Sequence, residues 1–144
     1  MPSRAVRERG SVLALMPAAV LVFIVLGSLA VDASLAFLGE REVANVAAAV
    51  ANDAATKGID IEHFYATGEV VLDPALVDDV ARGALANSGL HHLDDLTIEA
   101  EVVGVDAVIV RVRARVRSLF SKALPGGAES REVDAEAAAV AERG

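Results

Sequence analysis

The sequence contains no cysteine and no tryptophan, and it has one tyrosine among its 144 residues. Without cysteine the chain cannot form disulfides, thiolate zinc sites or iron–sulfur clusters, and it has no cysteine nucleophile. Aromatic residues make up only 3% of the chain, so we do not expect a large aromatic-lined pocket. We therefore expect no cofactor and no small-molecule substrate.

Charge is missing from one long stretch, Gly10 to Val31, which is bounded by Arg9 and Asp32. As a helix these 22 residues span roughly 33 Å, and the hydrocarbon core of a bilayer is about 30 Å thick. The stretch predicts a transmembrane helix at residues 10–31, with Arg9 and Asp32 at the membrane boundaries. Pro17 removes one backbone hydrogen bond and predicts a mild kink.

A cleaved signal peptide is the alternative to a retained membrane anchor. Ser28-Leu29-Ala30 and Val31-Asp32-Ala33 both offer small residues at a spacing that suits cleavage. The apolar run is longer than the 7–15 residues of a signal peptide core. We therefore favour an anchor that is kept in the mature protein.

The charges on the two sides of the span differ in sign. Arg4, Arg7 and Arg9 stand against Glu8 in residues 1–9, whereas residues 32–144 hold 10 basic and 20 acidic side chains. The positive-inside rule predicts a short, disordered cytoplasmic segment at 1–9 and an exported remainder. The protein is thus expected to be a single-pass cytoplasmic (inner) membrane protein with its C-terminal domain outside the cytoplasm. Such an acidic domain is a poor partner for nucleic acid.

The helix is expected to continue beyond the membrane, over residues 32–57. Small apolar residues recur there at helical spacing, and Lys57 followed by Gly58 is typical of a helix end. This stripe should pack on the protein's own sheet or on the helix of a partner subunit. We name it as the candidate partner-interaction face: Val43, Val46, Ala47, Val50 and Ala54.

Residues 58–144 predict a small α+β domain. We expect a connector at 58–72, whose Ile59, Ile61, Phe64 and Tyr65 tuck against the domain. Asp73-Pro74 is a strong start signal for a short helix ending near Asn87.

Alternating apolar and polar residues predict strands at 96–103 and 107–117. The segment 132–140 alternates too, but it is rich in alanine, so strand is favoured and helix stays open. The three strands should form an antiparallel sheet with 107–117 in the centre, and the residue numbers of each pair in the first hairpin should sum to 210 or 212. The long helix should lie on the apolar face of this sheet, formed by Val108, Val110 and Val112.

Few residues suggest chemistry. Arg111, Arg113, Arg115 and Arg117 could bind an anion, but acidic residues on both neighbouring strands favour ion pairs across the sheet. His91-His92 with Asp94-Asp95 lacks the spacing of a metal site, and a polar loop is the simpler interpretation. No nucleophile with a recognisable base and no phosphate or dinucleotide motif is present, so we predict no catalytic residues and no enzyme.

Asp32 is the first charged residue after the apolar span. It could serve as a stop signal in the headgroup region. Alternatively, it could make a specific polar contact with a partner subunit.

One pattern resembles a known family. Arg9-Gly10-Ser11, the apolar span, Ala30-Val31-Asp32 and the alanine-rich segment 45–55 with Asn45, Asn52 and Asp53 are similar to the TadE/TadG-like proteins of bacterial tight-adherence (Flp-type) pilus systems. The resemblance covers residues 9–57 well and residues 58–144 more weakly. It implies a minor pilin or pseudopilin-like component of pilus assembly.

The chain departs from prepilins at one position. Processed prepilins carry a glutamate five residues after the glycine, and here Leu15 stands there. The resemblance therefore does not extend to prepilin processing. The sequence predicts a non-catalytic, membrane-anchored component of a pilus assembly or secretion machine, which contacts lipid and other machine subunits. A membrane-anchored binding or sensor module is the alternative.

Overall fold

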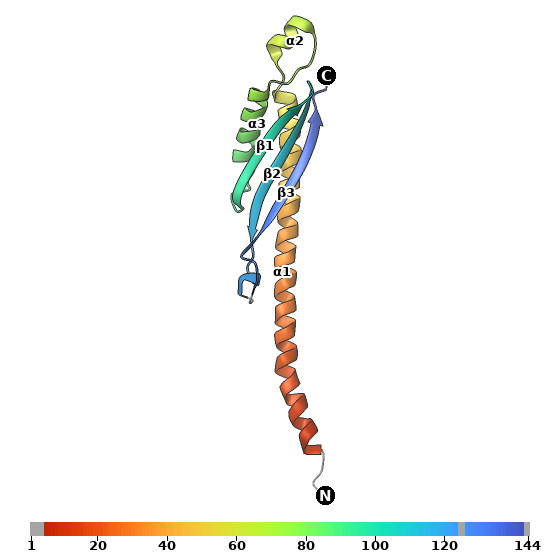
Figure 1. Ribbon diagram of the computed structural model, residues 1–144, viewed down its shortest axis with the longest axis vertical. Helices are drawn as coiled ribbons and strands as arrows, with labels where there is room; N and C mark the ends of the chain where they lie inside the picture. The colour runs from red at the N-terminus through yellow and green to blue at the C-terminus, as the bar shows by residue number, and fades with distance from the viewer. Residues whose placement is uncertain (1–4, 124–125, 143–144) are drawn as a thin grey trace.

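The computed structural model describes residues 5–123 and 126–142, with side chains from Leu15 onward. It has an α+β fold in which every other element gathers around one half of a single long helix (Figure 1). This helix, α1, runs without interruption from Ala5 to Lys57 and is about 80 Å long. Residues 5–9 are helical, so the expectation of a disordered segment at 1–9 is wrong for them, while residues 1–4 lie outside the described residues.

The two halves of α1 have different surroundings. Beyond Leu15 the first half is long enough and apolar enough to cross a membrane, and almost none of it is covered by protein. In Figure 1 this half extends below the domain as a bare rod and leans near its red end. Pro17 lies inside α1. The outer half lies under the sheet. A single helix thus belongs both to the candidate membrane span and to the domain core.

The sheet has three antiparallel strands in the order β1-β2-β3, as predicted. They are β1 (Asp94–Val103), β2 (Ala107–Arg117) and β3 (Ser130–Val140). The alanine-rich segment is therefore a strand. In the first hairpin Glu99 pairs with Arg111 and Ile98 with Val112, which gives the predicted sum of 210.

The core is built almost entirely from valine and alanine. Val108, Val110 and Val112 are buried on the face of β2 that packs on α1. Alanines of α1 let the helix backbone approach this face closely. At Gly39 the helix comes so near to β2 that a larger residue would overlap it. A Cβ built on Gly39 would lie 2.5 Å from Cγ2 of Val116.

The helix α3 (Pro74–Ala86) fills the space beside α1 and β1. Its start is the predicted one, since the Asp73 carboxylate accepts a hydrogen bond from the Ala75 amide at 2.8 Å and Pro74 opens the first turn. Val77 and Ala81 are buried, whereas Leu76 is exposed.

A second short helix, α2 (Ile61–Thr67), replaces the expected connector. Asp60 caps it by accepting a hydrogen bond from the His63 amide at 2.9 Å, and Gly68 ends it with a φ of 76°. Because α2 projects from the end of the domain (Figure 1), Ile61, Phe64 and Tyr65 are exposed and do not tuck against it. Only Ile59 packs against the core, next to its bridge with Leu72.

Candidate functional site

The predicted partner-interaction face on α1 is almost entirely inside the protein. Val43, Ala47, Val50 and Ala54 are 0–2% exposed and belong to the core formed with the sheet and α3. The sequence left open whether this face packs on the protein's own sheet or on the helix of a partner subunit. In the structure it packs on the protein's own sheet. The assignment of these four side chains to a partner subunit is therefore corrected. They pack inside the protein and hold the domain to α1.

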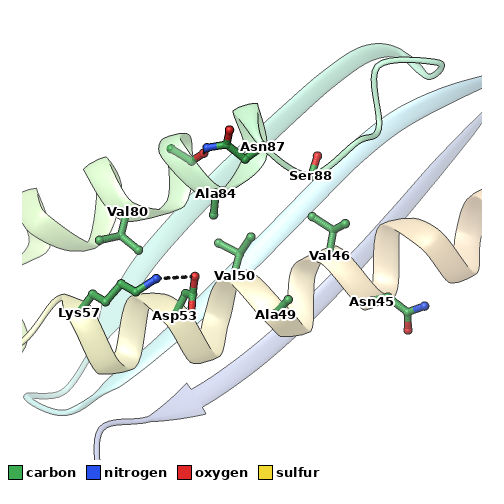
Figure 2. A pocket seen from close by; sticks show the side chains of 11 residues that line it. Asn45, Val46, Ala49, Val50, Asp53, Lys57, Val80, Ala84, Asn87 and Ser88 are labelled. Carbon is green, nitrogen blue, oxygen red and sulfur yellow. Dashed lines mark hydrogen bonds and ion pairs between the residues drawn. The ribbon is translucent and has the colours of Figure 1, made fainter.

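Val46, the fifth residue of that face, is half-buried at the edge of a groove between α1 and α3 (Figure 2). The groove has a volume of about 580 Å³. Figure 2 shows Val46 and Val50 rising from α1 toward α3, and Val80 and Ala84 descending from α3 toward α1. The floor of the groove is thus apolar. Ala49 and Gly83 also line it, and their small size keeps the groove open.

Four of the polar residues along the groove bond to groups that are close to them in the sequence: Asp53, Lys57, Asn87 and Ser88. Lys57 Nζ lies 2.9 Å from Asp53 Oδ2, and the Asn87 side-chain amide donates to the Gly83 carbonyl at 2.8 Å. The Ser88 hydroxyl donates to the Leu85 carbonyl. No nucleophile is hydrogen-bonded to a base among the residues that line the groove.

Asp32 makes the most elaborate polar contact among the described residues. Its carboxylate accepts hydrogen bonds from the backbone amides of Leu119 (2.9 Å), Phe120 (3.2 Å) and Ser121 (2.6 Å), and from the Ser121 hydroxyl. Residues 121–123 form the short 3-10 turn η1, which follows β2. Asp32 therefore clamps the loop between β2 and β3 onto α1, just beyond the apolar span.

Donation to a carboxylate favours its ionised form. The Ser121 hydroxyl, with the three backbone amides adding to it, lowers the pKa of Asp32 from 3.8 to about 2, although desolvation acts in the opposite direction. Asp32 is thus charged at neutral pH and holds the loop as an anion. Neither sequence interpretation anticipated this, because the donors are 87–89 residues away and three of them are backbone amides.

The second boundary residue, Arg9, lies in α1, within the part of the chain for which only the backbone is described.

The arginine face of the sheet is exposed and ion-paired, as expected. Arg111 pairs with Glu136 across the β2–β3 hairpin, and Arg113 lies 3.7 Å from Glu99 on β1. Arg115 and Arg117 pair with Asp95 and Asp94. These pairs leave little net positive charge for an anionic ligand.

A bulge at the start of β1 makes the last two pairs possible. The register shifts between Asp94 and Thr97, and Asp95 adopts a φ of 50°. A bulge places two residues opposite one on the neighbouring strand, so both carboxylates reach arginines. His92 of the candidate metal cluster bonds to Glu42 at 2.9 Å, and among the described side chains, residues 15–123 and 126–142, no group of three ligand side chains could hold a metal ion.

Comparison with known proteins identifies no relative. The chain matches no family model, no curated protein and no solved structure.

Proposed function

We propose that this protein is a non-catalytic, membrane-anchored component of a Flp/Tad-type pilus assembly or secretion machine, similar to TadE/TadG-like proteins. The observation that carries the proposal is α1 itself. From Leu15 onward its first half is apolar and bare, and its outer half is the spine of the domain, with no break between them. Such a helix fixes a domain rigidly to a membrane, which suits a structural subunit.

The span is proposed to be kept in the mature protein. Cleavage after Ala33 would remove Asp32, and the amides of Leu119, Phe120 and Ser121 would lose their acceptor. The arginines at the start of the sequence favour a cytoplasmic N-terminus and a domain outside the cytoplasm.

The α1–α3 groove is the proposed contact with the machine, in place of the buried stripe. The occupant that we propose is a helix of another machine subunit, presenting small apolar side chains. Ala49 and Gly83 support this choice, because small residues let two helix backbones approach closely. The mixed polar rim, with Asp53, Lys57 and Asn87, also suits a surface that is wet before assembly.

Site-directed crosslinking in native membranes tests this function. Because the chain has no cysteine, Ala49→Cys gives a single thiol in the groove. The matched control, Thr97→Cys, places a thiol on the exposed arginine face of the sheet. We expect Ala49→Cys, and not Thr97→Cys, to crosslink to a subunit encoded with the pilus or secretion machine.

A companion variant separates docking from folding. Ala49→Trp fills the groove from an exposed position on α1, so it should block recovery of the partner while the domain keeps its circular dichroism spectrum. Equal crosslinking from both cysteine positions, or full partner recovery with Ala49→Trp, would contradict the proposal.

The alternative of a binding or sensor module has one observation in its favour. A cavity of about 690 Å³ at the far end of the domain is lined by Ile59, Ile61, Phe64, Tyr65 and Val70, among others. Saturable binding of a small apolar ligand that is lost in Phe64→Ala would favour this function over assembly.

A further inference from the structure

Two adjacent large apolar side chains are exposed where the chain leaves β2. Leu119 is 54% exposed and Phe120 is 45% exposed, and they immediately precede η1. In an aqueous environment an exposed pair of this size is unfavourable.

The height of this pair relative to the membrane span is fixed by hydrogen bonds. The amides of both residues donate to Asp32, the first charged residue after the span. A cleft between the loop and α1 is lined on the helix side by Leu29, Asp32, Ala33 and Ala36. The loop therefore lies level with the outer end of the apolar stretch 10–31. Figure 1 agrees, since the blue loop hangs below the sheet beside the orange part of α1.

The loop is also prepared for an apolar environment. A backbone amide that loses water must find another acceptor, and the amides of Leu119, Phe120 and Ser121 already have one in Asp32. Lys122 follows directly and is exposed. A lysine at this depth can extend its ammonium to lipid phosphates while its methylene chain stays among apolar groups.

We propose that Leu119 and Phe120 insert into the bilayer at the boundary between headgroups and acyl chains. The occupant of this surface is thus lipid, continuous with the lipid around α1. The loop gives the domain a second membrane contact, which restrains its rotation and tilt about the single helix. This inference rests on the proposed membrane span.

Tryptophan fluorescence tests the depth of the loop, because the chain has no tryptophan of its own. Phe120→Trp reports on the loop, Phe23→Trp on the span, and Tyr65→Trp on α2 at the opposite end of the domain. Phe23 and Tyr65 are 81% and 84% exposed, so neither substitution disturbs a core. Each full-length variant is reconstituted into phosphatidylcholine–phosphatidylglycerol vesicles, with or without brominated acyl chains.

We expect brominated lipid to quench Phe23→Trp and Phe120→Trp strongly and to leave Tyr65→Trp unchanged. Emission from Phe120→Trp should also lie at shorter wavelength than emission from Tyr65→Trp. Leu119→Trp repeats the measurement, in case one substitution alters the loop.

The two proposals fail in distinguishable ways. If Phe23→Trp is quenched while both loop variants behave like Tyr65→Trp, the span stands and the loop insertion is overturned. If Phe23→Trp is not quenched, the span fails and the loop insertion fails with it. The loop tryptophan could also be shielded from water in native membranes but exposed to water in lipid vesicles. That result would identify a protein partner, and it would also overturn the lipid assignment.

Discussion

Gly39 offers a direct test of how tightly the sheet is seated on α1. Alanine has a higher helix propensity than glycine by up to about 1 kcal/mol. At Gly39, however, the new Cβ would lie 2.5 Å from Cγ2 of Val116, which is well inside van der Waals contact. Gly83, in α3, has nothing within 4 Å of a built Cβ, so it reports the propensity gain without the overlap.

The two effects oppose each other at Gly39 only. Relieving an overlap of this kind in a packed core typically costs about 1–3 kcal/mol. Gly83→Ala should therefore stabilise the domain by up to about 1 kcal/mol, and Gly39→Ala should range from neutral to about 2 kcal/mol destabilising. The gap between the two variants should be about 1–3 kcal/mol.

The measurement is urea unfolding of the full chain in detergent micelles, followed by circular dichroism. A third variant removes the atom that Gly39→Ala would strike. In a Val116→Ala background, Gly39→Ala should lose most of its penalty, and a double-mutant cycle gives the coupling. If Gly39→Ala proves as stabilising as Gly83→Ala, the close approach of α1 to β2 described above is refuted.

Three further outcomes are expected. Arg113→Ala should cost less than about 1 kcal/mol, because its ion pair with Glu99 is exposed, whereas Val112→Asp should cost on the order of 4 kcal/mol or more, because it buries an unpaired charge; thermal unfolding compares the two. The pKa of Asp32 is lowered to about 2, so its contribution to stability is fully present above pH 3.8 and is lost as the pH falls toward 2. The protection factor of the Ser121 amide against hydrogen exchange should fall over that interval, and Asp32→Asn should abolish this fall. Alkaline phosphatase fused after Gly144 should be active and β-galactosidase at the same position inactive; the reverse pattern would contradict the proposed orientation.

The elements that could be predicted from the sequence are those whose signal is local. The strand 107–117 alternates valine and arginine, so its period, faces and central position follow from side-chain polarity alone. The start of α3 follows from Asp73-Pro74 for the same reason. The end of α1 at Lys57 could also be predicted, because a glycine follows it.

The sequence also contains a local signal for the short helix α2. Asp60 three residues before His63, with Gly68 beyond the last turn, is a cap at each end of a short helix. The apolar residues between these caps predict a core-facing segment, because hydrophobicity alone cannot distinguish a core from an exposed tip.

The Asp32 clamp could not be predicted in the same way. Its donors are mainly backbone amides, which carry no sequence signature, and they lie at the far end of the chain. For a related reason, the sequence could not show what the candidate partner-interaction face of α1 packs against. A face of valine and alanine is equally suited to its own sheet and to a foreign helix, and only the position of the sheet decides.

The shared use of α1 also dictates an order of events during biogenesis. The spine of the core, residues 43–55, is synthesised early, yet it is covered by β2 and β3, whose buried residues follow some 60–90 positions later. Contacts of such long sequence separation form slowly. Until β3 is synthesised, the valine–alanine face next to the candidate membrane span stays uncovered. The newborn chain is therefore most vulnerable to misassociation and proteolysis in the interval before β3 arrives.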